Sequence, residues 1–171
     1  MVGHWVALPT PSKTAALDRA IGELVGPRDG RWRLVHVLYS QCRCSQRIFD
    51  HLLSRPPPSL ATELVLLVGP NEQFRTRARE RGFAVQEIAR EALKERFGIE
   101  SAPMLLIASP DGIVRYAGGY TLQNQGLDYR DLEFLNLIRT GVDVDELPVY
   151  GCGVSRELQS YLDPIGVKYA R

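Results

Sequence analysis

The sequence lacks the features that define several classes of protein. Its 171 residues include only three cysteines, too few for the disulfide framework of a small secreted domain, and one stays unpaired if the other two bond. It contains no apolar run near the roughly 20 residues that a helix needs to cross a bilayer. Its 21 basic and 20 acidic residues leave a net charge of +1. That balance excludes the strong positive field with which a protein grips nucleic acid or an acidic membrane surface.

The sequence also lacks the common motifs of other enzyme classes. HExxH, the P-loop pattern, GxGxxG and GxSxG do not occur. The residues that can carry chemistry are therefore mainly the three cysteines and the histidines.

The first residues, MVGHWVALPTP, have neither the basic region nor the longer apolar region of a signal peptide. An apolar start that contains tryptophan and prolines suits the juxtamembrane end of an anchored protein. We therefore expect an extracytoplasmic, periplasm-facing location with the anchor outside this chain, and a cytoplasmic location is the alternative. Arg outnumbers Lys 18 to 3, a bias typical of GC-rich bacterial genomes.

What the sequence does show is an alternation of expected strands and helices, which is typical of an α/β protein. The apolar fraction of 44% and the length suit one domain with its own core. The expected strands are residues 31–39, 63–68 and 83–88 and the hairpin arms 103–108 and 113–120. The expected helices are residues 12–25, 45–54, 71–81, 91–97, 128–140 and 155–162. This order predicts a central mixed β-sheet flanked by helices.

Two cysteines stand where the first buried strand gives way to a helix. Cys42 and Cys44, separated by Arg43, come at the expected start of that helix. Unpaired N–H groups and the helix dipole stabilise a thiolate at such a position. A disulfide between residues i and i+2 closes a small, strained ring, which favours donating or exchanging disulfides over reducing stable ones. The same two sulfurs can instead bind copper or one edge of an iron–sulfur cluster.

Two segments resemble the thioredoxin-like superfamily. LVHVLYSQCRC is similar to its strand leading to a reactive cysteine, and FGIESAPMLLIASPDG is similar to its segment around a cis-proline. The resemblance covers roughly residues 31–140 and implies a thioredoxin-like fold with Pro103 cis and facing the sulfur. We therefore expect an N-terminal segment with a helix (1–30), a thioredoxin-like domain (31–140) and a C-terminal extension (141–171) that carries Cys152.

The chain departs from the family pattern near the cysteines. The family has Cys-x-x-Cys where this chain has Cys42-Arg43-Cys44, and an aromatic residue where it has Gln41. His36 stands six positions before Cys42, where thioredoxin has a buried aspartate. These changes argue against ordinary thioredoxin-type reductase activity. His36 can carry protons for the thiols or be a core histidine bonded to a neighbouring carbonyl.

Our interpretation is a thiol-disulfide oxidoreductase that needs no cofactor. Cys42 is the attacking and more exposed thiol, Cys44 resolves the mixed disulfide, and His36 assists proton movement. The resemblance implies that Ala102 and Pro103 shape the loop where substrate docks. The expected partners are protein thiols and disulfides or a redox partner protein.

Two alternatives remain open at this stage. The first is an electron-transfer or metal-binding module in which Cys42, Cys44 and Cys152 hold copper or an iron–sulfur cluster, with a homodimer if two chains share the cluster. The second is an interaction domain without redox activity. Cys152, between two glycines in YGCGVS, can be a resolving thiol, a metal ligand or a small residue of the tail. We expect the segment 148–155 to pack within reach of Cys42 or Cys44, and His51 to lie on the surface.

Overall fold

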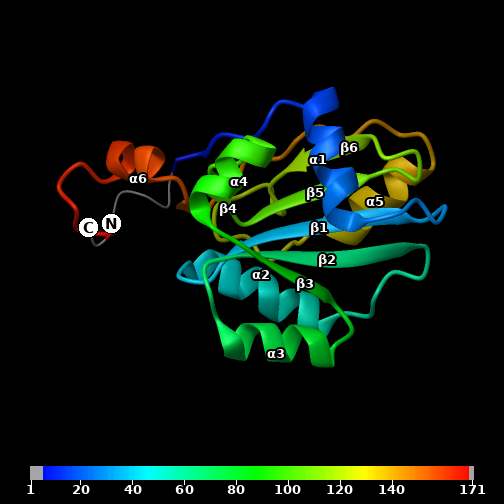
Figure 1. Cartoon of the computed structure of the whole chain (residues 1–171), viewed down its shortest axis with the longest axis horizontal. Coiled ribbons are helices and arrows are strands. Elements are labelled where there is room, and N and C mark those ends of the chain that lie inside the picture. The colour runs from blue at the N-terminus through cyan, green and yellow to red at the C-terminus, as the bar shows by residue number, and fades with distance from the viewer. Residues whose placement is uncertain (1–5, 170–171) are drawn as a thin grey trace.

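A five-stranded mixed sheet with strand order β3-β2-β1-β5-β6 forms the centre of the protein (Figure 1). The structure, a computed structural model, describes residues 6–169. The parallel strands are β1 (Trp32–Tyr39), β2 (Ala61–Val68) and β3 (Ala84–Ile88). The hairpin strands β5 (Met104–Ala108) and β6 (Val114–Gly118) run antiparallel, with β5 beside β1. The predicted α/β architecture is confirmed, and it is the thioredoxin-like fold.

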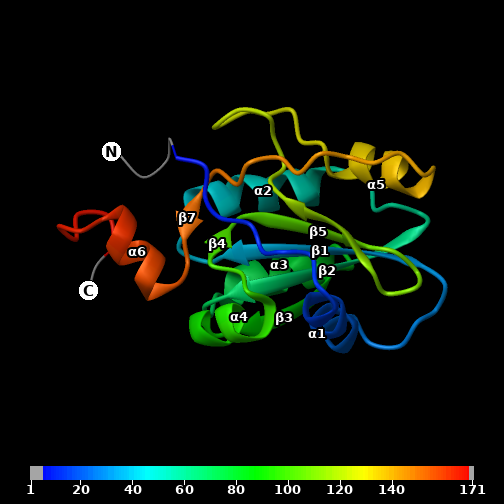
Figure 2. The same ribbon diagram turned by 90° about the horizontal axis from the view of Figure 1, so that it is seen from above.

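Helices cover both faces of this sheet (Figure 2). Side chains of α2 (Arg43–Ser54), α3 (Glu72–Glu80) and α5 (Asp131–Arg139) form one apolar cluster on the sheet. Side chains of α1 (Ala15–Val25) and α4 (Arg90–Phe97) form the other. No helix within residues 6–169 is long and apolar enough to cross a membrane.

Strand β1 contributes to both clusters, because successive side chains of a strand point to opposite faces. Leu34 and Leu38 belong to the α2 cluster, whereas Val35, Val37 and Tyr39 belong to the α1 cluster. A strand buried on both faces is apolar along most of its length, which is why the sequence predicted it well.

Helix α2 begins immediately after Cys42, which is its N-cap residue in extended conformation. Ser45, in the first turn, accepts a 3.0 Å hydrogen bond from the Tyr39 backbone N–H and so ties the helix to the end of β1. Ile48, Phe49 and Leu52 bury one face of the helix. Strand β1 and helix α2 therefore hold the Cys42 backbone on both sides.

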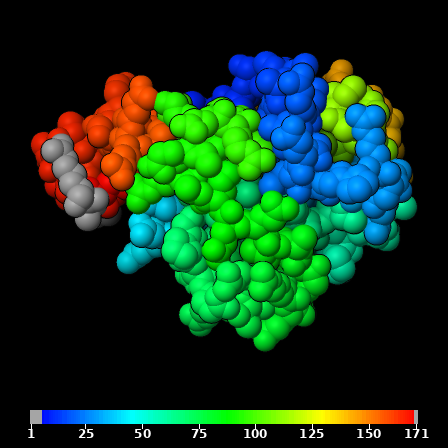
Figure 3. Space-filling model, in the orientation of Figure 1, coloured from blue at the N-terminus to red at the C-terminus, as the bar shows by residue number. Residues whose placement is uncertain are grey.

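The C-terminal part of the chain returns to the start of the hairpin. Strand β7 (Cys152–Gly153) pairs antiparallel with β4 (Ser101–Ala102), and Cys152 lies opposite Ala102. Helix α6 (Arg156–Leu162) follows. Figure 3 shows this segment, in orange and red, packed against the green region of α4 at one end of the molecule. The pairing of two-residue strands has no periodicity, so the sequence pattern gave no sign of β4 or β7.

Candidate functional site

All three cysteines of the chain meet at the N-terminus of α2. Cys42 caps the helix, Cys44 lies in its first turn, and Cys152 comes from β7. No disulfide joins them in this structure. The side chains of Cys152 and Cys44 both interact with the Cys42 sulfur, and both interactions lower the pKa of Cys42. The expectation that the segment 148–155 reaches the cysteine pair is therefore confirmed.

The loop before β5, at Ala102 and Pro103, lies close to the Cys42 sulfur. The Ala102–Pro103 peptide bond is cis, as the resemblance implies, and the Ala102 carbonyl oxygen lies 3.9 Å from Cys42 Sγ. Gly151 packs on this loop so closely that a Cβ atom there would sit 2.0 Å from the Ala102 oxygen and 2.6 Å from Pro103 Cδ. Only glycine at position 151 lets the tail approach this closely.

The surroundings of Cys42 favour its thiolate. Hydrogen bonds from Cys152 and then from Cys44 lower the pKa of Cys42 to about 3, against the opposing effect of burial. Backbone N–H groups of Ser45 and Cys44, at the open end of α2, act in the same direction. These influences all favour the thiolate of Cys42 over the thiolates of its two neighbours.

The other two thiols are held in their protonated form. The pKa of Cys152 and the pKa of Cys44 are both raised, because each donates a hydrogen bond to Cys42 and each is partly desolvated. The positive charge of Lys168 opposes this rise at both sulfurs. The site therefore contains one stabilised thiolate and two thiols.

The expectation that Cys42 is the more exposed thiol is wrong. Cys42 is 3% exposed and Cys152 is 5% exposed, whereas Cys44 is half-buried. The reason is the tail, since β7 lies along β4 and covers the sulfur that emerges from β1. Ala102 and Pro103, expected to dock substrate, are likewise buried beneath this segment.

His36 does not join the thiols. It faces the α2 cluster, where its Nδ1 lies 2.8 Å from the Tyr120 hydroxyl and its Nε2 lies 3.0 Å from Glu63. Both ring nitrogens therefore have partners other than a sulfur. This placement gives no support to the expected role of His36 in moving protons for Cys42 or Cys44.

A buried polar network continues from Glu63. Arg55 contacts Glu63 and lies 2.8 Å from Asp131, whose other oxygen is 2.9 Å from His51 Nε2. Burial raises the pKa of Asp131, but the hydrogen bond from His51 and the charge of Arg55 outweigh it and lower this pKa to about 2. His51 is half-buried in the network, so the expectation that it lies on the surface is wrong.

A cleft of ≈ 470 Å³ opens beside the thiols. Cys152 forms part of its wall, together with three cationic side chains and aromatic and amide groups, namely Arg43, Arg90, Lys168, Tyr39, Tyr169, Gln41 and Gln159. Lys168 and Tyr169 come from the last residues described, and Arg90 opens α4. These three residues could not be predicted from the sequence, because only the returning tail brings them to the cysteines.

The metal-binding alternative gains no support from the arrangement of side chains. Between residues 6 and 169 no group of three or more His, Cys, Asp or Glu is placed to hold an ion. We therefore derive no step through copper or an iron–sulfur cluster.

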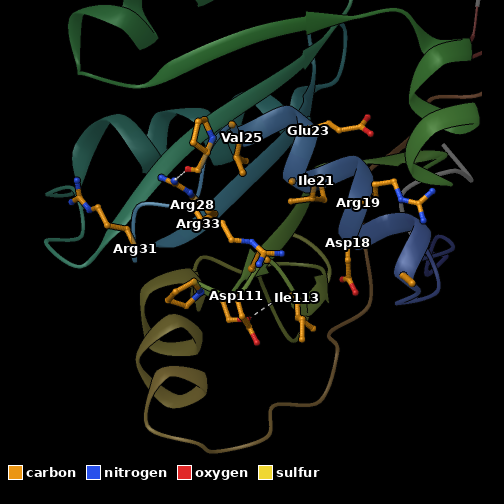
Figure 4. Close-up of a pocket in the computed structure, with 18 residues that line it drawn as sticks. Asp18, Arg19, Ile21, Glu23, Val25, Arg28, Arg31, Arg33, Asp111 and Ile113 are labelled. Atoms are coloured by element: carbon orange, nitrogen blue, oxygen red, sulfur yellow. Dashed lines mark hydrogen bonds between the residues drawn. The ribbon is translucent and has the colours of Figure 1, made fainter.

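A second cavity, of ≈ 600 Å³, lies between α1 and the turn of the β5–β6 hairpin (Figure 4). Several of its charged groups already have partners within the protein. Arg33 pairs with Asp29, and Asp18 accepts a 2.8 Å hydrogen bond from the Val114 N–H. None of the residues that line it is a cysteine or a histidine. The cysteine cluster is therefore the stronger candidate site.

Comparison with known proteins bears on the fold alone. No protein-family model and no curated protein matches the chain. An uncharacterized conserved protein from Geobacillus kaustophilus is 15% identical, with a TM-score of 0.54 over 91% of this chain and 93% of that one. A hypothetical protein from Sinorhizobium meliloti 1021 is 15% identical, with a TM-score of 0.55 over 90% and 93%. A secreted disulfide oxidoreductase from Mycobacterium tuberculosis is 10% identical, with a TM-score of 0.43 over 78% and 96%.

Proposed function

We propose that this protein carries out thiol–disulfide exchange with Cys42 as its reactive thiolate. One observation carries the proposal, namely that Cys152, from a separate strand, meets Cys42 and Cys44 at a helix N-terminus, where the pKa of Cys42 is lowered. A purely structural cysteine in a core is a weakly polar residue and needs no such partners. A stabilised thiolate beside a second thiol is the arrangement that disulfide exchange requires.

The reaction proceeds in two displacements. The Cys42 thiolate attacks one sulfur of a substrate disulfide, forms a mixed disulfide, and releases the other substrate sulfur as a thiolate that takes a proton from water. A second thiol of the cluster then loses its proton and attacks Cys42 Sγ, which releases the remaining substrate sulfur. The substrate disulfide is reduced to two thiols and two protein thiols become a disulfide. The reverse sequence oxidises a dithiol substrate.

We propose that Cys152 is the second thiol, in place of the Cys44 expected from the sequence. A Cys42–Cys44 bond closes a strained ring between neighbours in the chain, whereas Cys152 approaches Cys42 from a separate strand. The hydrogen bond from Cys152 is also the largest influence on Cys42. Once Cys42 is in a mixed disulfide its charge is gone, so the main cause of the raised pKa of Cys152 disappears. Lys168 then favours the Cys152 thiolate.

The direction that we propose is disulfide donation. A thiolate with a low pKa is a good leaving group, and it stabilises the reduced protein, which makes the disulfide oxidising. Such a protein suits an oxidising, extracytoplasmic compartment, and its partners would be compounds or proteins that carry thiols.

Equilibration of the protein with defined ratios of reduced and oxidised dithiothreitol or glutathione tests this function. We expect a potential less negative than about −200 mV, the range of disulfide donors and isomerases and not of thioredoxin. Cys42→Ser should abolish exchange. A wild-type protein that exchanges no disulfide with either buffer contradicts the proposal. Metal analysis of protein purified without air tests the alternative, because stoichiometric iron or copper on these cysteines would overturn the redox assignment.

A further inference from the structure

The cleft beside Cys152 contains positive charge without a carboxylate to balance it. Arg43, Arg90 and Lys168 line it, and no Asp or Glu is among the residues of its wall. Within the part of the chain that the structure describes, none of these three cations forms an ion pair with a carboxylate. The buried Arg55, by contrast, pairs with both Glu63 and Asp131.

Lys168 is the most informative of the three. Its Nζ is buried and has no hydrogen-bond partner among the described residues, and it lies 5.0 Å from the centre of the Tyr169 ring. A buried ammonium without a hydrogen-bond acceptor is costly, and a bound anion would remove that cost. The local fold holds this lysine in place, because the Asp163 carboxylate accepts hydrogen bonds from the backbone N–H groups of Lys168 and Tyr169 at 2.7 and 2.9 Å.

The other groups of the cleft are fixed in complementary positions. Arg90 donates a 3.1 Å hydrogen bond to Gln159 and its guanidinium lies 5.7 Å from the centre of the Tyr39 ring. Tyr169 accepts a 2.9 Å hydrogen bond from the Gly153 N–H, directly after Cys152. The cationic groups and the Cys152 sulfur are therefore held on one framework, and a ligand that contacts these cations lies beside the pair formed by Cys152 and Cys42.

From this arrangement we propose that the cleft binds small thiol compounds and disulfides that carry carboxylate groups close to sulfur. The proposal names the substrate class of the site and rests, for its chemistry, on the proposed exchange at Cys42 and Cys152. A volume of ≈ 470 Å³ lies within the usual range for small ligands, about 300–1,000 Å³. An extended protein segment has less room, since the edge of β4 is already paired with β7.

Three symmetric disulfides that differ mainly in charge test the chemistry. They are 3,3′-dithiodipropionate, which is anionic, bis(2-hydroxyethyl) disulfide, which is neutral, and cystamine, which is cationic. Each compound oxidises the reduced full-length protein, and the rate constant of this reaction is measured. It is divided by the rate constant for the reaction of the same disulfide with 2-mercaptoethanol, which corrects for the intrinsic reactivity of that disulfide. We expect the anionic compound to react about tenfold faster than the neutral one, and cystamine to react more slowly than either.

Variants then assign the preference to the cleft. The ratio of interest is the corrected rate constant of the anionic disulfide divided by that of the neutral one. Lys168→Gln and Arg90→Gln should each lower this anionic-to-neutral ratio by about fivefold. The ratio is the relevant quantity because loss of Lys168 also alters the pKa of Cys152, which affects every disulfide alike. Arg77→Gln is the matched control, since it removes the same charge from α3, where Arg77 pairs with Asp50 outside the cleft. That control should leave the ratio unchanged.

Binding without reaction separates this inference from the proposed function. Suberate has the shape of 3,3′-dithiodipropionate with two methylene groups in place of the sulfurs, so it binds without exchange. Calorimetry should detect suberate binding to the wild type and its loss in Lys168→Gln.

Equal rates for the three disulfides, or a ratio that Lys168→Gln does not change, overturn the inference while leaving exchange intact. A Lys168-dependent preference for a disulfide in a Glu-rich peptide, without one for 3,3′-dithiodipropionate, also overturns it. Suberate binding with no reaction of any disulfide overturns the proposed function alone.

Discussion

At the scale of single residues, the charge on Cys42 depends on the two thiols that face it. Cys152 lowers the pKa of Cys42 more than Cys44 does. The helix N-terminus supplies the rest through backbone N–H groups. Cys42 is therefore a thiolate because of its neighbours and not because of exposure, since it is among the more buried residues of the chain.

Replacing either neighbour should raise the pKa of Cys42 from about 3, and Cys152→Ala should raise it more than Cys44→Ala. Alanine is the appropriate replacement because serine would still donate a hydrogen bond. The thiolate absorbance near 240 nm, followed as a function of pH in the reduced protein, reports the midpoint. A larger shift in Cys44→Ala than in Cys152→Ala would contradict this account of the site.

The cysteine cluster could be predicted from the sequence, including the approach of the Cys152 segment, but the cationic cleft beside it could not. Cys42 and Cys44 follow a strongly apolar strand, so their position at a helix start could be predicted. The partners of His36 could not, because Glu63 and Tyr120 reach it from other strands and loops. Lys168 and Arg90 are far apart in the sequence, and only tertiary packing joins them.

At the scale of secondary-structure elements, the short strand β7 closes the site. Its contact with β4 depends on Gly151, where a Cβ atom would meet the Ala102 oxygen at 2.0 Å. Both partners at that point are backbone or ring atoms of a buried loop, so neither can move aside cheaply. The position of Cys152 therefore depends on a residue with no side chain.

Gly151→Ala should displace β7 and expose Cys42. We expect iodoacetamide to alkylate Cys42 faster in this variant, by about tenfold or more, together with a rise in the pKa of Cys42. Peptide mapping after a timed reaction measures the first effect. Gly22→Ala is the control, because a Cβ atom there meets nothing within 4 Å. Equal alkylation rates in the two variants would show that β7 does not cover the sulfur.

A second feature at this scale is the buried polar network that joins α2, β2 and α5 through Arg55, Glu63 and Asp131. This network contributes to the stability of the folded state. The folded pKa of Asp131 is depressed, from 3.8 to about 2. A depressed carboxyl pKa stabilises the folded state above pH 4, and this stabilisation is lost as pH falls through about 2. This shift in the pKa of Asp131 corresponds to a contribution of about 2 kcal/mol to the free energy of unfolding at neutral pH.

Asp131→Asn should lower the free energy of unfolding at pH 7 by about 3 kcal/mol, because it leaves Arg55 and His51 without their shared carboxylate. Asp50→Asn, which breaks an exposed pair with Arg77, should cost less than about 1 kcal/mol. Urea unfolding at pH 7 and at pH 3 measures both values. The wild type should lose more stability than Asp131→Asn over this interval, and an equal loss would contradict the assignment.

At the scale of the whole molecule, the C-terminal part of the chain returns to the site that forms where β1 ends and α2 begins. The alternating core from β1 to β6 follows apolar periodicity and could be predicted strand by strand. The approach of the segment 148–155 to the cysteines could also be predicted, from the glycines that flank Cys152, but its pairing with β4 could not, because two-residue strands have no periodicity. The parts that the sequence did not predict are thus the strand pairing that buries Cys42 and the cationic wall of the cleft.

The central claim, that Cys42 and Cys152 form the redox disulfide, is tested most directly by a tryptic map of the oxidised protein. Trypsin cleaves after Arg43 and places the three cysteines on separate peptides, 34–43, 44–47 and 140–156. The protein is oxidised by a limiting amount of neutral disulfide, blocked with iodoacetamide in denaturant at mildly acid pH, digested, and analysed without reduction. The account predicts peptide 34–43 joined to 140–156, with Cys44 alkylated. Peptide 34–43 joined to 44–47, with Cys152 alkylated, would contradict it.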